Sequence, residues 1–422
     1  MHTYFLQAFA CMQRLNIDHK SRRQDNPTWN YNYKLEMNKL FSTSVRSGWK
    51  NSRATAHTAW VANAYLTRIL TAQVYEVAHE TPMQYAPNLS ALLGNEIYLK
   101  REDTQPVFSF KIRGAFNKIA SLSEEKRKKG VVTCSAGNHA QGVALSANKL
   151  EIQATIVMPL ATPTIKVNAV RRFGGKYVNV VLHGQNYDEA AAEAKRRMQD
   201  EGLTLVHPFD DPDVIAGQGT IGMEIVKALN SKQLDAVYVC VGGGGMIAGI
   251  AAYLKALRPD VRIIGVEADD AAGMTASLQA GSVITLSQVG LFADGAAVRT
   301  VGTETFRVCN ELVDEMVTVG TDEICAAIKQ GFNETRCVME PAGALAIAGL
   351  TKHIKQNGWT NKVDSYFFCF NTLEAVFQFT INIILIQTFV AITSGANIDF
   401  DRLRFVSERA DSSETLVSGR IV

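Results

Sequence analysis

The chain has 422 residues, of which 47% are apolar and 8% aromatic, enough to bury one large core or two medium ones. Its 43 basic and 41 acidic residues leave a net charge of +2, so no nucleic-acid partner is expected. The seven cysteines lie scattered, without a Cys-x-x-Cys pair or a cluster with histidines. This pattern predicts reduced thiols and no metal site.

The N-terminal part is polar up to residue 36, and residues 37–75 contain no acidic residue while basic residues are spread among Ser, Thr and Ala. Such a composition is typical of an organelle transit peptide, and Met37 is a candidate start. We therefore expect residues 1–64 to be an N-terminal extension that directs the protein to mitochondria, with the plastid as the alternative. A merely disordered N-terminus is the other interpretation.

Short, β-branched apolar runs alternate with segments of helical spacing from about Tyr65 to Leu350. Strands that are apolar on both faces and alternate with helices predict a mostly parallel sheet with helices on both sides, an α/β fold. The expected strands are 95–100, 131–134, 154–158, 177–182, 236–241, 263–266 and 389–393. The clearest expected helices are 165–173, 187–198, 215–229 and 246–257.

One lysine is set among aromatic residues in Val107–Gly114, which reads Val-Phe-Ser-Phe-Lys-Ile-Arg-Gly. We expect Lys111 at the end of a short strand, ahead of a helix. An amine attacks an aldehyde only when it is unprotonated, and Phe108 and Phe110 would favour that form by desolvating the cation. Arg113 would act in the same direction by like-charge repulsion. A surface lysine whose stem covers an apolar patch is the alternative.

A polar loop follows the expected strand 131–134 and opens a helix. Backbone N–H groups at such a helix start can hold a carboxylate, and we expect this loop to bind substrate. Its residues are Ser135, Ala136, Gly137, Asn138 and His139. The side chain of Asn138 could also contact the 3-oxygen of a cofactor ring. A helix N-cap at Ser135 or Asn138 is the structural alternative.

A run of four glycines follows the expected strand 236–241 and precedes a helix. Glycines let successive N–H groups converge on a phosphate at a helix N-terminus. This loop consists of Gly242, Gly243, Gly244, Gly245 and Met246. A dinucleotide site is the alternative, because the loop also fits the relaxed G-x-G-x-x-A pattern and Glu267 ends the next strand.

Ser394 ends the expected strand 389–393, where its hydroxyl could bond to a pyridine nitrogen. A hydroxyl does not stabilise a protonated ring as a carboxylate does, which favours loss of a β-leaving group over transamination. An imine-forming lysine, an anion-binding helix start, a phosphate-cradling glycine loop and a strand-end serine are the parts of a pyridoxal 5′-phosphate site. Together they predict an enzyme.

Residues 363–387 are apolar and aromatic without clean periodicity. A membrane span is disfavoured because Asn371, Glu374, Gln378 and Asn382 would fall within the hydrocarbon, so no membrane partner is expected. We interpret the segment as a retained intron. Every valine codon begins with GT and glutamine can be encoded by CAG, so the segment can begin and end with splice-site dinucleotides.

These motifs resemble the biosynthetic threonine dehydratase family (threonine ammonia-lyases), fold-type II pyridoxal phosphate enzymes. The resemblance runs from about residue 65 to 408, interrupted by 363–387. The segments that carry it are Tyr98–Asp103, Ser109–Gly114, Ser135–Gly142, Phe292–Val298, Glu340–Ala344 and Thr393–Asn397. It implies two open, twisted, mostly parallel sheets flanked by helices, as in the tryptophan synthase β-chain, with a small subdomain of about 103–212 inserted in the large one.

The resemblance also implies an activity, the deamination of L-threonine, and also of L-serine, to a 2-oxoacid and ammonia. For threonine the product is 2-oxobutanoate, in the first step of isoleucine biosynthesis. Lys111 would bond to the cofactor and remove the α-proton, Asn138 would bind the cofactor, Gly242–Met246 would hold its phosphate, and Ser394 would face the ring nitrogen. A homo-oligomer, dimer or tetramer, is expected.

The chain departs from the family pattern in three places. Ala342 stands where the family usually has serine, the segment 363–387 has no counterpart, and 409–422 is expected to be a truncated tail where a regulatory domain would begin. Two alternatives stay open: a serine dehydratase or serine racemase, and a catalytically inert splice product that only associates with full-length subunits.

Overall fold

The computed structural model describes residues 56–359, 363–371, 376–384 and 386–418. Contacts divide the chain into two units, Met1–Arg53 and Ala54–Val422, and all described residues belong to the second. Most of the predicted transit peptide therefore lies outside the described residues. Helix α3 (Ala56–Leu70) already buries Val61 and Ala62, so this folded unit begins before the expected boundary at residue 64.

The larger sheet has six strands in the order β1-β2-β12-β7-β8-β9. Only β1 is antiparallel to its neighbour, and the other neighbouring strands run parallel. Every side chain of β7 and β12 is buried, as the apolar sequences of both strands predict for a sheet covered on two faces. The strands are β1 (Met83–Tyr85), β2 (Glu96–Lys100), β7 (Ala236–Cys240), β8 (Arg262–Ala268), β9 (Glu315–Val319) and β12 (Thr388–Ile392).

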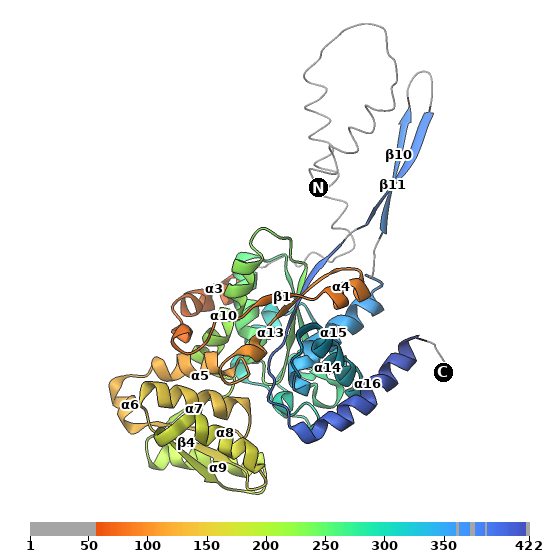
Figure 1. Ribbon diagram of the computed structural model, residues 1–422. Coiled ribbons are helices and arrows are strands. Elements are labelled where there is room, and N and C mark those ends of the chain that lie inside the picture. Colours follow the sequence, from red (N-terminus) through yellow and green to blue (C-terminus); the bar gives the residue numbers. More distant parts are fainter. Residues whose placement is uncertain (1–55, 360–362, 372–375, 385, 419–422) are drawn as a thin grey trace. The chain divides into compact units, whose positions relative to one another are not determined.

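The smaller sheet has four parallel strands in the order β5-β4-β3-β6. Figure 1 shows helices α7, α8 and α9 packed around it. Its core is separate from that of the larger sheet, as expected for a subdomain with its own packed layers. The strands are β3 (Val131–Cys134), β4 (Ala154–Met158), β5 (Val178–Leu182) and β6 (Thr204–Leu205).

Helices cover the larger sheet on two sides, with α3 and α10 on one side and α14 and α15 on the other (Figure 1). Helix α15 packs along β7, β8, β9 and β12, and α11 packs on β7 and β8. The predicted α/β fold with two mostly parallel sheets is therefore confirmed. The remaining helices are α4 (Pro87–Leu93), α5 (Lys111–Ala120), α6 (Glu124–Lys129), α7 (Asn138–Leu150), α8 (Thr164–Gly174), α9 (Tyr187–Asp200), α10 (Pro212–Ala228), α11 (Gly245–Leu257), α12 (Gly273–Ala280), α13 (Thr303–Leu312), α14 (Thr321–Thr335), α15 (Pro341–Gln356) and α16 (Leu403–Ser418).

The described part of the chain also contains six short 3-10 helices. They are η1 (Val74–Glu76), η2 (Glu102–Thr104), η3 (Gly175–Tyr177), η4 (Asp269–Ala271), η5 (Asp294–Ala296) and η6 (Phe400–Arg402).

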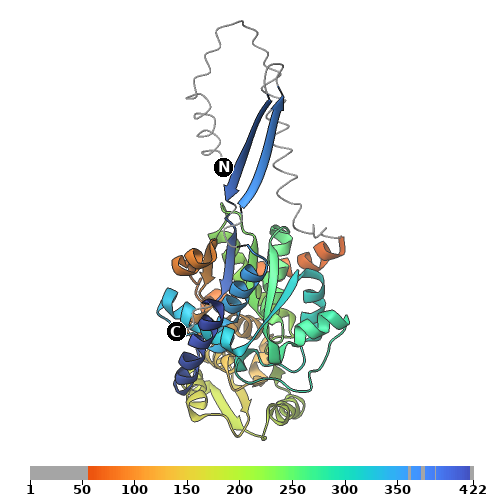
Figure 2. The ribbon, with the colours of Figure 1, turned by 90° about the vertical axis from the view of Figure 1, so that its right-hand side faces the viewer.

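The segment expected to be an insertion forms two antiparallel strands, β10 (Val363–Asn371) and β11 (Val376–Ile384), seen as the two long arrows in Figure 2. They form a two-stranded sheet of their own and do not join the six-stranded sheet. Val363 pairs with Ile384, so the segment leaves and returns at adjacent positions. Within the described ranges, no helix is both long and apolar enough to cross a membrane.

Candidate active site

Three of the four candidate motifs follow the carboxyl ends of parallel strands. The loop that begins at Ser135 follows β3, the loop that begins at Gly242 follows β7, and Ser394 follows β12. In open parallel sheets, ligands bind outside the carboxyl ends of the strands. The fourth motif joins them through backbone contacts, because the N–H of Phe110, next to Lys111, donates to the carbonyl of Ser394 at 3.2 Å.

Lys111 is the first residue of helix α5. The predicted strand end before it is not formed as a strand: residues 105–110 are turns and bends with one isolated β-bridge, from Ser109 to Gly395, and Phe108 lies in the left-handed region at φ 57°. The Lys111 Nζ donates to the carbonyl of Pro208 at 2.8 Å. Although part of the side chain remains accessible, burial lowers the pKa of the Lys111 amine to about 8. A substantial fraction of the amine is therefore neutral near physiological pH.

The neighbours of Lys111 act differently from the expectation. The ring of Phe110 lies 5.2 Å from Nζ, but Phe108 is 46% exposed and contributes little desolvation. Arg113 does not lower the pKa of Lys111 by repulsion, because two buried carboxylates, Glu102 and Glu224, pair with its guanidinium. Burial is the cause of the low pKa of Lys111.

The loop from Ser135 to His139 leads into helix α7, whose N-cap is Gly137. The alternative interpretation, an N-cap at Ser135 or Asn138, is wrong: no side chain caps this helix, and the Ser135 hydroxyl instead accepts a bond from the Gly137 N–H at 3.2 Å. Ala136 contributes no polar side-chain atom. The first N–H groups of α7 therefore have no side-chain cap, and they suit a carboxylate.

Asn138 is held at both ends of its amide. Its Nδ2 donates to the Glu340 carboxylate at 2.5 Å, and its Oδ1 accepts a bond from Asn397 Nδ2 at 2.7 Å. Burial raises the pKa of Glu340 to about 7. The amide keeps one N–H that could reach a cofactor oxygen, and its orientation is fixed by residues from α15 and from the segment after β12.

The glycine loop joins β7 to α11, whose N-cap is Gly244 at φ 94° with no side-chain cap. The Gly243 carbonyl accepts a bond from Thr305 Oγ1 at 2.6 Å. A Cβ atom at Gly243 would lie 2.2 Å from the Phe209 ring, so only glycine fits there. Phe209 follows Pro208, whose carbonyl accepts the bond from Lys111, so the lysine and the glycine loop both contact this short segment. Met246, the second residue of α11, is buried.

Ser394 is buried behind these loops. Its hydroxyl donates to the Ala342 carbonyl at 3.2 Å. Cys134 and Cys240 are buried, and burial raises the pKa of each thiol to about 12, so neither is a reactive thiolate. Ala342, the departure from the family's serine, therefore meets Ser394 through its backbone.

The dinucleotide interpretation of the glycine loop fails at Glu267. This residue is fully buried, and its carboxylate accepts bonds from the Met274 N–H at 2.8 Å, the Thr275 N–H at 2.9 Å and the Thr275 hydroxyl at 2.6 Å. Both oxygens are used to cap helix α12. They are not available to a ribose.

Comparison with known proteins agrees with this geometry. A family model described as "Pyridoxal-phosphate dependent enzyme" matches residues 74–365. The solved structure of the processed form of threonine deaminase isoform 2 from Solanum lycopersicum is 47% identical, with a TM-score of 0.74, over 83% of this chain and 93% of that one. The chain belongs to the pyridoxal-phosphate dependent enzyme family.

Two curated members of this pyridoxal-phosphate family are similar over most of the chain. The L-threonine dehydratase biosynthetic IlvA of Burkholderia multivorans is 52% identical over 350 residues, which are 83% of this chain and 64% of that protein. The mitochondrial threonine dehydratase of Schizosaccharomyces pombe is 51% identical over 347 residues, which are 82% of this chain and 54% of that protein. The chain thus spans between about half and two thirds of these relatives, and the expected resemblance to threonine dehydratases is confirmed.

The pyridoxal-phosphate cofactor fits the residues that are present. Two buried polar atoms, Ser109 Oγ and His139 Nδ1, have no partner within the described part of the chain, which suits a site with a polar ligand. His139 Nε2 bonds to the Val206 carbonyl at 2.9 Å, and burial lowers the pKa of His139 to about 3, so its Nδ1 is a neutral acceptor. The glycine loop would hold the phosphate, and Lys111 would bond to the cofactor.

Several residues of this family site were missed as candidates from the sequence. Glu340 and Asn397 stand inside segments already recognised, but their contact with Asn138 depends on the fold. Phe209 and Thr305 close the glycine loop from segments without a sequence signal. A carboxylate directly before Pro341, at the start of an apolar helix, was the only signal that could have pointed to Glu340.

Proposed function

We propose that this chain deaminates L-threonine to 2-oxobutanoate and ammonia. The observation that carries the proposal is the position of Lys111, whose amine has a pKa of about 8 and is held by Pro208 beside an uncapped glycine loop. The similar proteins described above are threonine dehydratases and a threonine deaminase, which supports threonine as the substrate. L-Serine, which also carries a β-hydroxyl, is expected to be accepted.

The chain's residues divide the work of this reaction. Pyridoxal phosphate, when bound, withdraws electrons from the substrate α-carbon. The N–H groups of the Ser135–His139 loop would bind the substrate carboxylate, and the Lys111 amine would remove the α-proton. The β-hydroxyl then leaves as water, and the released enamine takes up water to give 2-oxobutanoate and ammonia.

Ser394 would direct the outcome of the reaction. Its side chain is a neutral hydroxyl, not a carboxylate, and the bond to the Ala342 carbonyl holds that hydroxyl in place. A hydroxyl partner would not stabilise a protonated ring nitrogen as a carboxylate does, so Ser394 would favour loss of the β-hydroxyl. This preference supports elimination over transamination and racemisation.

The wider role follows from the same proposal. Formation of 2-oxobutanoate from threonine would be the first step of isoleucine biosynthesis. We propose an organellar location, because a similar protein is named mitochondrial, and the plastid stays the alternative. We also propose that the protein is a homo-oligomer, either a dimer or a tetramer. We propose that the chain consists of an N-terminal extension, a catalytic region of about 65–408 with its small subdomain, and a short tail at 409–422.

One experiment tests the proposal against its alternatives. The purified chain is loaded with pyridoxal phosphate, and its ultraviolet–visible spectrum is recorded before and after addition of L-threonine, with 2-oxobutanoate measured in parallel. We expect a visible band that changes on addition, followed by 2-oxobutanoate. Deamination of L-serine without turnover of L-threonine would indicate a serine dehydratase. Formation of D-serine from L-serine would indicate a racemase. No turnover of either would indicate an inert splice product.

A further inference from the structure

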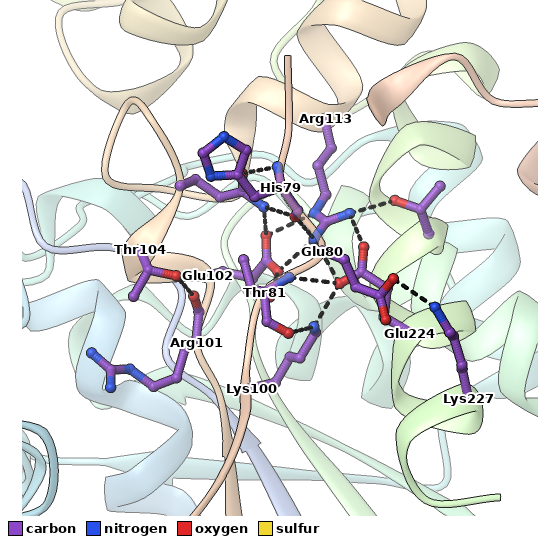
Figure 3. Close-up of polar contacts among 12 residues, drawn as sticks. His79, Glu80, Thr81, Lys100, Arg101, Glu102, Thr104, Arg113, Glu224 and Lys227 are labelled. Carbon is purple, nitrogen blue, oxygen red and sulfur yellow. Dashed lines mark hydrogen bonds and ion pairs between the residues drawn. The ribbon is translucent and has the colours of Figure 1, made fainter. Parts of the chain in front are cut away.

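Four charged side chains form a buried cluster that the proposed reaction does not use. They are Lys100, Glu102, Arg113 and Glu224, which we call the four-charge cluster (Figure 3). All four residues are at most 2% exposed. Two positive and two negative charges balance, so the cluster is neutral when all four are ionised. Although burial by itself raises the pKa of Glu102, the Arg113 charge lowers it below its usual range.

Arg113 is the centre of the cluster. Its guanidinium donates to Glu102 at 2.8 Å from both Nε and Nη2, and to Glu224 at 2.6 Å from Nη1 and 2.9 Å from Nη2. Nη1 also donates to the Thr220 hydroxyl at 3.0 Å, and Nη2 to the His79 carbonyl at 3.1 Å. All three nitrogens are engaged in a planar arrangement that a lysine ammonium does not reproduce.

The partners of Arg113 come from elements that surround the larger sheet. Glu102 lies in η2 and Glu224 in α10. Lys100, at the end of β2, bonds to Glu224 at 2.5 Å and to the Thr81 carbonyl at 2.6 Å. The Thr81 hydroxyl bonds in turn to Glu102 at 2.6 Å. Arg113 therefore attaches the first turn of α5 to the strand, loop and helix that frame the larger subdomain.

Lys111 occupies the same helical turn, two residues before Arg113. The N-cap of α5, Phe110, makes no side-chain cap bond, so the helix start is not fixed in that way. Two glycines allow other backbone segments to approach instead. A Cβ at Gly142 would lie 3.1 Å from the Lys111 carbonyl, and a Cβ at Gly217 would lie 2.7 Å from the Arg113 carbonyl. The first turn of α5 is thus confined between α7 and α10. The bonds of Arg113 to Glu102 and Glu224 fix the same turn.

We propose that Arg113 is a positioning residue for Lys111, acting through the geometry of the four-charge cluster rather than through its charge. The proposal rests on the proposed function, in which Lys111 bonds to the cofactor and removes the α-proton. Because Arg113 and Lys100 together balance the two carboxylates, the cluster carries no net charge, and Arg113 is not among the groups that shift the pKa of Lys111. It fixes the turn from which the lysine side chain extends toward Pro208 and the glycine loop.

The test compares the cofactor-loaded wild-type chain with Arg113→Lys, which keeps the charge and loses the planar contacts. We expect kcat for threonine to fall by about 10- to 100-fold with little change in KM, because a misplaced reacting group lowers the chemical step. We also expect a weaker visible circular dichroism signal from the cofactor, which reports its fixed orientation. Lys227→Gln is the control. Lys227 lies on α10, as Glu224 does, and the substitution breaks only its exposed ion pair with Glu80.

A folded Arg113→Lys variant with wild-type kcat and circular dichroism, even with a lower Tm, would overturn the proposal. If that variant does not fold, the double substitution Lys100→Met with Glu224→Gln decides. This double variant keeps the charges balanced and leaves Arg113 paired with Glu102. A lower kcat and a weaker circular dichroism signal in it would support the proposal that the cluster positions Lys111. Wild-type kcat and circular dichroism in the double variant would show that the cluster only stabilises the fold. Failure of both variants to fold, while Lys227→Gln folds, would show the same. Absence of a visible band or threonine turnover in the wild type would instead refute the proposed function.

Discussion

At the scale of single residues, the environment of Lys111 shows that burial sets its chemistry more than its sequence neighbours do. Phe108 points into solvent and Arg113 is neutralised, yet the pKa of the lysine still falls to about 8. The segment 107–114 points to Lys111 as the candidate reactive residue. It did not give the reason for the reactivity, because desolvation comes from residues distant in sequence.

The first prediction concerns the pH dependence of cofactor attachment. Only the neutral amine attacks the aldehyde, and with a pKa of about 8 half of the Lys111 amines are neutral at pH 8, against under about 1% for an ordinary lysine. The rate at which the visible band forms, when pyridoxal phosphate is added to the cofactor-free protein, should rise between pH 6 and 9 with a midpoint near 8. Stopped-flow absorbance measures this rate.

Lys111→Ala is the matched control for that measurement. It should bind the cofactor without forming the protein-linked visible band, and it should lose threonine turnover. A midpoint above pH 10 in the wild type would show that the amine is not desolvated. Full activity of the alanine variant would exclude Lys111 as the reactive residue.

The second prediction concerns Ser394, which is 2% exposed and bonds to the Ala342 carbonyl. Ser394→Asp should protonate the cofactor ring nitrogen, lower threonine elimination by about tenfold or more, and divert part of the flux to transamination or racemisation. The ratio of 2-oxobutanoate to the other products, together with the visible spectrum, measures the effect. Ser394→Ala is the control, because it removes the hydroxyl without adding charge and so separates the effect of the carboxylate from that of lost packing. Unchanged product ratios in Ser394→Asp would show that Ser394 is only a packing residue.

At the scale of the elements, glycines decide how closely helices approach one another. Gly217 in α10 faces the backbone of α5, and Gly249 in α11 faces the backbone of α10, where an added Cβ would lie 2.3 Å from the Ile215 carbonyl. These contacts place α5, α10 and α11 in close succession beside the sheet. The helical periodicity predicted these helices, but the need for glycine at the crossings depends on tertiary packing.

The third prediction compares two glycines of α10. A Cβ at Gly217 would lie 2.7 Å from the Arg113 carbonyl, whereas a Cβ at Gly222 meets its nearest atom, the Ile250 carbonyl, at 3.2 Å. Gly217→Ala should lower the free energy of unfolding by about 1–3 kcal/mol, because the helices must move apart. Gly222→Ala should change it much less, since the gain in helix propensity of about 1 kcal/mol offsets the tighter contact.

Thermal or urea denaturation of the cofactor-free forms measures this difference. Equal stabilities of the two variants would show that the α5–α10 crossing has room to adjust. In that case the confinement of the Lys111 turn by Gly217 would be weaker than the geometry indicates.

At the scale of the whole molecule, one asparagine side chain bonds to the backbone near both ends of the segment 363–387. The Trp359 carbonyl accepts a bond from Asn95 Nδ2 at 3.2 Å, and the Gln387 N–H donates to Asn95 Oδ1 at 3.1 Å. One side chain therefore contacts Trp359, shortly before the segment, and Gln387, its last residue. Since β10 and β11 pair only with each other, their removal takes no strand from the six-stranded sheet.

The fourth prediction follows from this attachment and from the retained-intron interpretation, which stays a hypothesis. A chain lacking 363–387 should fold, turn over threonine at a rate similar to that of the full chain, and give a higher soluble yield. Closing the longer loop costs only a few tenths to about 1 kcal/mol, whereas an apolar β-prone segment promotes aggregation. Soluble yield and specific activity of both forms, with sequencing of the transcript, test it; a dominant messenger with these codons and equal solubility would contradict it.

The sequence by itself determined the alternating strands and helices, the α/β class and the four motifs at the candidate site. These depend on local periodicity and on the chemistry of adjacent residues, which the linear order preserves. Only the tertiary structure decided that Lys111 begins a helix, that Gly137 rather than Ser135 or Asn138 caps α7, and that Glu340 and Asn397 orient Asn138. The orientation of Asn138 depends on contacts between segments distant in the chain, and the helix starts depend on backbone geometry that the local sequence pattern does not specify.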